Sequence, residues 1–191
     1  RIRVLVVDDS AFMRKAIVQL IESDPKLCVI DTAVNGEECI AKINEHKPDV
    51  VTLDLEMPVL NGHEALRRIR RECRTNPGGA PAVLVCSSLT QEGSRDALQA
   101  MREGAADVIA KDSSKFSVNM HAMRDDLVAK IKAVAAGRTR ARLAALSPKK
   151  DLPPFESQPV SFAGAKIALI AIGSSTGGPP VLEMILRQMP A

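Results

Sequence analysis

Five short runs of β-branched and other apolar residues alternate with helical patterns over the first 136 residues, and this alternation limits the fold more than any other feature. The runs lie at 2–7, 28–33, 49–53, 82–87 and 106–109. They are continuously apolar, which is typical of strands buried on both faces of a parallel sheet. Capping residues predict a helix over 36–46, and an apolar stripe predicts a last helix near 118–136. The sequence therefore predicts a doubly wound α/β domain over 1–136, with a five-stranded parallel sheet.

The chain changes character after residue 136. Residues 137–165 hold four prolines, several serines and little apolar periodicity, so we expect a linker there. Its first half is basic, with five Lys or Arg residues and no acid between Gly137 and Lys150. A charge run of this kind is more often a solvated linker than a binding surface.

A second domain is expected to begin at 166–191. The run KIALIAI at 166–172 has the pattern of a buried strand, and a turn rich in glycine and serine separates it from a helical pattern. One strand and one helix bury too little surface to fold alone, so we expect only the first βα unit of a second α/β domain here. The turn reads G-S-S-T-G, the G-x-S-x-G form of a nucleophile elbow, with Ser175 as the nucleophile. A glycine-rich turn that binds phosphate, or binds nothing, is the alternative.

Composition excludes several classes of function. The 26 basic and 23 acidic residues are too balanced for a protein that binds polyanions with its whole surface. The chain has no Trp or Tyr and therefore lacks the stacking platforms that single-stranded nucleic acids need. Its four cysteines show no C-x-x-C spacing, so neither a zinc site nor a disulfide framework is indicated. Apolar stretches are too short for membrane insertion, and we expect a cytoplasmic protein.

Polar residues end four of the five predicted strands. They are Asp8 and Asp9, Asp54, Ser87, and Lys111. Because the carboxyl ends of parallel strands meet at one edge of the sheet, these side chains should lie together. Three carboxylates in one place favour a shared cation, and oxygen ligands suit Mg²⁺. A carboxylate beside Mg²⁺ and a lysine can accept a phosphoryl group. The alternative is structural: the first two acids cap a helix, and Lys111 pairs with a carboxylate.

The segments VLVVDDS, VTLDLEMPVLNG, VLVCSS and GAADVIAK resemble the receiver domain of bacterial two-component response regulators. This resemblance implies a flavodoxin-like fold with Asp54 as the phosphoacceptor and Asp8 and Asp9 as its acidic pocket. It also implies that Mg²⁺ is held by Asp9, Asp54 and the main-chain carbonyl of Glu56. Ser87 and Lys111 would bind the phosphate.

Two positions depart from the receiver pattern. Asp112 follows Lys111 where the family usually has proline, and Val108 occupies a strand position that is often aromatic. We expect the phosphate site to survive both changes, but an aromatic rotamer switch is not available to this chain.

The order of receiver, linker and AIGSSTGG resembles the chemotaxis protein-glutamate methylesterases. That family hydrolyses glutamate methyl esters on methylated chemoreceptors, several members deamidate glutamines, and a chemotaxis histidine kinase is the phosphodonor. The resemblance places the nucleophile at Ser175 and the partner His and Asp beyond Ala191, so we expect this fragment to be inactive. His46, His63 and His121 are expected on solvated helix surfaces. The alternative function is a stand-alone phospho-switch response regulator that acts by binding protein or DNA.

Overall fold

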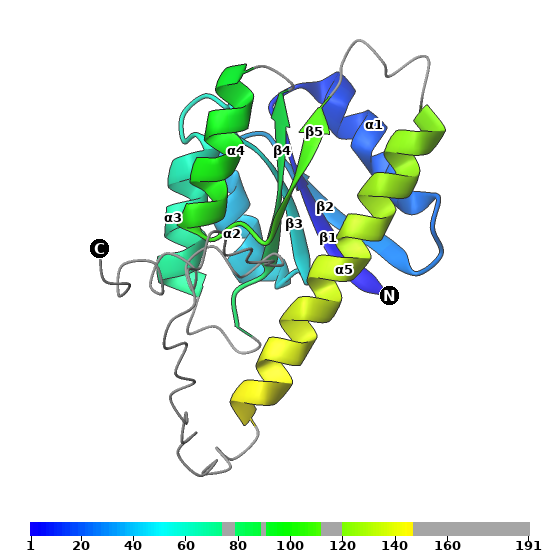
Figure 1. Ribbon diagram of the computed structural model, residues 1–191, viewed down its shortest axis with the longest axis vertical. Helices are drawn as coiled ribbons and strands as arrows, with labels where there is room; N and C mark the ends of the chain where they lie inside the picture. Colours follow the sequence, from blue (N-terminus) through cyan, green and yellow to red (C-terminus); the bar gives the residue numbers. More distant parts are fainter. Residues whose placement is uncertain (74–78, 89–90, 112–119, 147–191) are drawn as a thin grey trace, which may run out of the picture. The chain divides into compact units, whose positions relative to one another are not determined.

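Five parallel strands form the centre of the fold in the order β2-β1-β3-β4-β5 (Figure 1). The computed structural model describes residues 1–73, 79–88, 91–111 and 120–146. The strands are β1 (Ile2–Val7), β2 (Leu27–Ala33), β3 (Val50–Asp54), β4 (Ala82–Ser88) and β5 (Asp107–Lys111). The predicted five-stranded parallel sheet is therefore confirmed, with strand bounds within one or two residues of the apolar runs.

Helices cover both faces of this sheet. They are α1 (Ala11–Glu22), α2 (Gly36–His46), α3 (Gly62–Glu72), α4 (Gln91–Glu103) and α5 (Met120–Leu146). Figure 1 shows α1 and α5 on one face and α2, α3 and α4 on the other. Side chains of Ser10, Asn35 and Asn61 accept hydrogen bonds from the first turns of α1, α2 and α3, which fixes where these helices begin.

The sheet separates two apolar cores. Residues of β1 alternate between them: Leu5 and Val7 pack toward α2 and α3, whereas Val4 and Val6 pack toward α1 and α5. The central strands β1 and β3 are buried on both faces, as their continuous apolar runs predicted. This burial holds the carboxyl ends of the strands in fixed positions, and the site lies at those ends.

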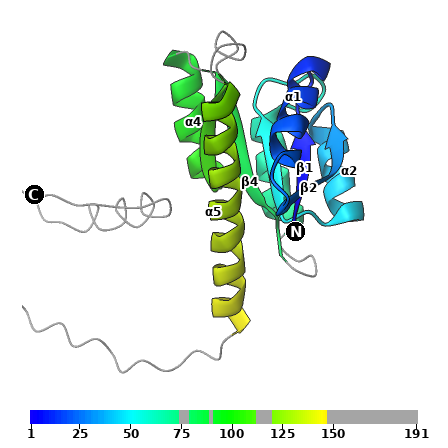
Figure 2. The same ribbon diagram turned by 90° about the vertical axis from the view of Figure 1, so that its right-hand side faces the viewer.

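The last helix is longer than the sequence predicted. We expected it to end at 136, but α5 continues to Leu146 and runs past the end of the sheet at which β1 begins (Figure 2). The first ten residues of the expected linker are therefore helical. The apolar stripe ends near 136, yet the alanine, leucine and arginine residues that follow are strong helix formers. Arg138 also anchors this part of α5 through bonds to the Ala80 carbonyl (3.0 Å) and the Asp49 carboxylate (2.8 Å).

The remaining sequence predictions fall mainly on residues 147–191. The chain divides into compact units at 1–142 and 143–191, and only the helical residues 143–146 of the second unit are described. The expected second-domain strand, its serine turn and most of the linker lie outside the described residues. No helix in the described ranges is long and apolar enough to cross a membrane.

Candidate functional site

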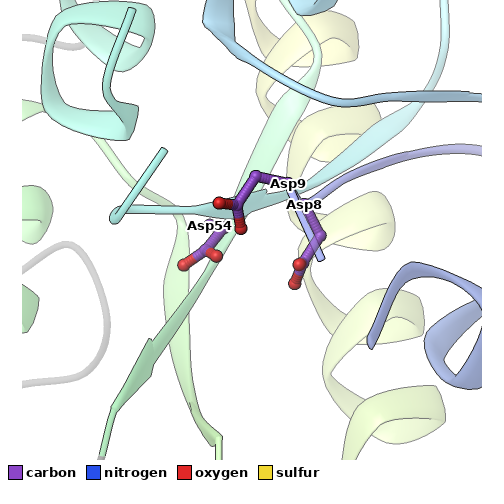
Figure 3. Close-up of side chains that lie close together, drawn as sticks. All are labelled: Asp8, Asp9 and Asp54. Carbon is purple, nitrogen blue, oxygen red and sulfur yellow. The ribbon is translucent and has the colours of Figure 1, made fainter. Parts of the chain in front are cut away.

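Three carboxylates gather at the carboxyl ends of β1 and β3 (Figure 3). Asp8, Asp9 and Asp54 each offer one oxygen, and these oxygens lie within 4.8 Å of one another. Asp8 and Asp54 are buried, whereas Asp9 is exposed. The register of the sheet produces this cluster, because β1 and β3 are paired directly, with Val7 opposite Leu53 at their ends. Reasoning from strand ends predicted that these three acids would meet.

Within the described part of the chain, one ammonium group lies among these acids. The Nζ of Lys111, at the end of β5, lies 2.6 Å from Oδ2 of Asp8 and 2.7 Å from Oδ2 of Asp54. Lys111 is only 14% exposed, so solvent screens these contacts weakly. One positive charge is thus shared by two buried carboxylates, and their negative charge is only partly neutralised.

The pKa values of the two central groups reflect this sharing. Burial raises the pKa of the Asp54 carboxyl, and Lys111 offsets that effect only in part. For Lys111, burial is the largest single effect and acts to lower the pKa of the ammonium, but the charge of Asp54 and the hydrogen bonds to Asp54 and Asp8 together outweigh burial, and the net shift of the pKa is upward. Cys86 pairs in register with Asp54, and burial raises the pKa of its thiol to about 12. The neighbours of Asp54 therefore include the neutral thiol of Cys86 and the charged ammonium of Lys111.

The turn after β1 is fixed by Arg14 of α1. Its Nη1 donates to the carbonyl oxygens of Asp8 (2.8 Å) and Asp9 (3.4 Å). The Asp8 carboxylate also accepts a bond from the amide of Ser10 at 3.0 Å. These contacts hold the backbone from which both acids project. The sequence offered a signal for this role, an arginine one turn into the helix after two acids, but we did not predict it.

The loop after β3 approaches the site closely. The amide of Gly62 donates to the Leu55 carbonyl at 3.0 Å, and a Cβ at Gly62 would lie 2.1 Å from the carbonyl oxygen of Asp54. Within this loop, Leu60 donates to the Pro58 carbonyl at 2.8 Å across Val59, whose φ is 68°. A β-branched residue in this left-handed region is strained.

The short distance between a Cβ at Gly62 and the Asp54 carbonyl oxygen leaves no room for a side chain at this position. The packing of α3 against the end of β3 therefore requires glycine at 62.

The structure describes the other predicted site residues only in part. The Glu56 amide donates to Oδ1 of Asp54 at 3.3 Å, and Glu56 is exposed. Ser87 is opposite Ala110 in the β4–β5 pairing, but its side chain lies outside the described part of the structure. Val108 lies in β5 and packs against the core on the α2, α3 and α4 face. Asp112 and Ser175 are among the residues that are not described.

The expectation of solvated histidines is wrong for His63. This residue is 17% exposed, and its Nδ1 lies 2.7 Å from the carboxylate of Glu103. His46 is partly exposed and lies 3.1 Å from Asp31. In both cases a distant carboxylate comes into reach only through the fold, so the histidine's neighbours in the sequence gave no signal. The side chain of His121 is not described.

Comparisons with known proteins agree with this geometry. A family model described as the response regulator receiver domain matches residues 4–123. A protein-glutamate methylesterase/protein-glutamine glutaminase of Symbiobacterium thermophilum is 44% identical over 198 residues, covering 100% of this chain and 53% of the relative. The chain thus spans about half the length of the curated relatives that it matches.

Solved structures agree as well. The response regulator domain of Thermotoga maritima CheB is 42% identical, with a TM-score of 0.62, and the match covers 71% of this chain and 96% of that domain. The CheX–CheY–BeF3–Mg²⁺ complex of Borrelia burgdorferi contains a chain that is 29% identical, with a TM-score of 0.57, over 70% of this chain and 88% of that one. The chain therefore belongs to the response regulator family, as a receiver domain of the type carried by protein-glutamate methylesterases.

Proposed function

We propose that this chain is the phosphorylation-controlled part of a chemotaxis methylesterase, with Asp54 as the phosphoacceptor. The observation that carries the proposal is the buried Asp54 carboxylate, 2.7 Å from Lys111 and within a cluster of three acids. A carboxylate in this position, beside the ammonium of Lys111, can act as the nucleophile toward phosphorus. The relatives that match the full chain are methylesterases, which supports the esterase assignment over a DNA-binding regulator.

Mg²⁺ is the metal that suits this site. The donors are oxygens only, and three carboxylate oxygens within 4.8 Å of one another repel unless a cation is shared. We assign its binding to the side chains of Asp9 and Asp54 and to the main-chain carbonyl of Glu56. When bound, Mg²⁺ offsets negative charge on the transferring phosphoryl group. The Mg²⁺ in the similar Borrelia burgdorferi complex supports this choice.

The residues of this chain then have distinct roles. An oxygen of Asp54 forms a bond to phosphorus as the bond from phosphorus to the histidine nitrogen of a chemotaxis kinase breaks. Lys111, which pairs with Asp8 and Asp54, transfers one of its hydrogen bonds to a phosphate oxygen. The Ser87 hydroxyl donates to another phosphate oxygen. Arg14 keeps Asp8 and Asp9 in position throughout, through their carbonyls.

The esterase chemistry is assigned to Ser175. In the sequence G-S-S-T-G this serine has the central position of a nucleophile elbow. Its oxygen attacks the carbonyl carbon of a glutamyl methyl ester, and methanol leaves with the serine proton. Water then hydrolyses the glutamyl-serine ester, which releases glutamate and regenerates Ser175. Attack on a glutamine side chain releases ammonia by the same acyl chemistry, and the names of the relatives include glutaminase. The substrates are methylated chemoreceptors, and we place the reaction in the cytoplasm.

The decisive experiment measures methanol release from methylated receptors by the full-length parent protein, with and without a small phosphodonor and Mg²⁺. We expect the phosphodonor to change the rate, Asp54→Asn to abolish that response, and Ser175→Ala to abolish hydrolysis. Ser174→Ala is the matched control and should retain activity. Hydrolysis that persists in Ser175→Ala would contradict the nucleophile assignment. A complete lack of hydrolysis by the unaltered protein would favour a stand-alone phospho-switch.

A further inference from the structure

The carboxyl-terminal ends of α3 and α4 form a second, distinct polar feature. The two helices pack side by side (Figure 1), and a groove of about 520 Å³ lies over their ends. Its lining consists of Arg67, Arg70, Arg71, Arg102 and Glu103. Four arginines and one acid line this groove, which gives the lining a net charge of 4 − 1 = +3.

The sequence concentrates arginine at this place. The segment 67–74 contains five arginines and one acid, Glu72, and residues 74–90 contain no acid at all. This excess is separate from the basic segment after Gly137. It is not needed to balance the remainder of α3, where Glu64 is the only other acid.

Only some of these arginines are used within the fold. Arg67 pairs with Glu64 (2.8 Å) and Glu103 (2.9 Å), and Arg71 pairs with Glu72 (2.8 Å). Among the residues that the structure describes, no carboxylate forms an ion pair with Arg70 or Arg102, and both side chains are exposed. Their charges remain available for a partner.

The groove has a rigid floor. Glu103 accepts bonds from His63 of α3 and from Gln99 at 3.0 Å, in addition to Arg67, and is only 14% exposed. Gly104, with a φ of 111°, ends α4 and leaves space for Arg70, whose Cδ lies 3.3 Å from where a Cβ would stand. Arg70 in turn donates to the Glu103 carbonyl at 3.4 Å. The guanidinium groups therefore project from a fixed surface.

The charge and shape of this groove favour a protein partner that presents carboxylate side chains at regular spacing. Helix C-termini present carbonyl oxygens and not N–H groups, so the groove lacks the backbone donors that typically hold a phosphate. With no Trp or Tyr in the chain, it also has no large aromatic platform for bases. Arg67 and Arg71 lie one helical turn apart, about 5.4 Å, which matches glutamates spaced by four residues on a partner helix. Their own ion pairs lie at the surface, where the side chains are 50% and 69% exposed, and exposed pairs contribute little stability, so partner carboxylates can replace them.

We propose that the groove lined by Arg67, Arg70, Arg71 and Arg102 is a docking site for an acidic protein helix that presents carboxylates one turn apart. Guanidinium groups suit this task because they bind carboxylates with two parallel hydrogen bonds. The proposal rests neither on phosphorylation at Asp54 nor on the esterase assignment.

The test uses this chain and a fluorescein-labelled, alanine-based helical peptide with glutamate at every fourth position, followed by fluorescence anisotropy. The matched peptide has glutamine in place of each glutamate. We expect the glutamate peptide to bind, the glutamine peptide not to bind, and added salt to weaken binding. The double variant Arg70→Gln/Arg102→Gln should bind about three- to thirtyfold more weakly, as expected for the loss of two exposed charge pairs.

Arg124→Gln, on the opposite face of the sheet in α5, is the control and should bind as the unaltered chain does. Unchanged far-ultraviolet circular dichroism and thermal melting would show that the double variant is folded. Equal binding of the two peptides, or an unaffected double variant, would overturn the proposal. A DNA duplex that binds the groove more tightly than the acidic peptide, with the same dependence on Arg70 and Arg102, would overturn the assignment of a protein partner.

Discussion

The ammonium of Lys111 lies 2.7 Å from the carboxylate of Asp54, although β4 separates their two strands in the sheet. The same ammonium lies 2.6 Å from Asp8. Among the described residues, this one ammonium therefore pairs with two buried carboxylates, and the charge of each carboxylate is offset only in part.

Lys111→Met should destabilise the chain by about 1–3 kcal/mol near neutral pH, because two buried carboxylates lose their shared donor. The folded-state pKa of Lys111 is raised, so its contribution is fully present below the unfolded pKa and is lost only as pH rises through the folded value. Urea unfolding is the measurement. Lys130→Met is the control: it removes a more exposed pair with Asp107, and its loss should be at most about 1 kcal/mol. Equal losses in the two variants would contradict the importance of burial.

Asp54→Asn should stabilise the chain by about 0.5–2 kcal/mol near neutral pH. Burial raises the folded-state pKa of Asp54, so the ionised group costs stability above that value, and the cost disappears below the unfolded pKa. The gain should therefore shrink as the solution is acidified.

Asp31→Asn provides a control of opposite sign. Burial is the largest single effect and acts to raise the pKa of Asp31, but the hydrogen bonds from Thr32, Lys42 and His46 and the charge of Lys42 together outweigh burial, and the net shift of the pKa is downward. Loss of this carboxylate should therefore destabilise at neutral pH, with a deficit that fades on acidification. If the stability changes of both variants respond to pH with the same sign, the environments of Asp54 and Asp31 do not shift the two pKa values in opposite directions.

Incubation with a small acyl phosphate and Mg²⁺ should add one phosphoryl group to the chain at Asp54. Intact mass spectrometry detects the increase, which should be absent in Asp54→Asn and retained in Asp31→Asn. Chelation of the metal should suppress it, because the acidic cluster needs a cation to admit another anion. Labelling that continues in Asp54→Asn would remove Asp54 from the phosphoacceptor role.

Gly62→Ala should cost about 1–3 kcal/mol or more of stability. The added Cβ would lie 2.1 Å from the Asp54 carbonyl oxygen and 2.6 Å from the Leu55 Cα, so the end of β3 must move. Phosphorylation should slow together with the loss in stability. Gly137→Ala has open space around it in α5 and should instead gain about 0.5–1 kcal/mol from helix propensity. Thermal melting of both variants measures the effect, and equal changes in the two variants would contradict a specific requirement for glycine at 62.

Val59→Asn should raise stability by about 1 kcal/mol, since asparagine tolerates the left-handed conformation that strains valine. Val59 is 82% exposed, so little apolar contact is lost. Leu98→Asn, at an exposed helical position, removes a similar apolar surface without relieving strain and should be neutral or slightly destabilising. An equal gain in both variants would attribute the effect to reduced apolar exposure and not to the backbone.

Much of the fold and of the acidic cluster followed from the sequence alone. Strands buried on both faces must be continuously apolar, so five such runs between helical patterns identified the parallel sheet. Parallel strands end at a common edge, so Asp8, Asp9, Asp54 and Lys111 could be predicted to meet there. These are consequences of local pattern and of one general rule of sheet geometry, and neither needs a specific long-range contact.

Only the tertiary structure decided the features that depend on particular distant neighbours. Arg138 extends α5 beyond Gly137 because it reaches Asp49 and the Ala80 carbonyl across the fold. His63 becomes largely buried because Glu103, at the end of another helix, comes within 2.7 Å. Gly62 is indispensable because α3 begins against the backbone of Asp54. Local propensity and periodicity carry no information about such pairs, since their energies arise only when packing brings together residues that are far apart in the chain.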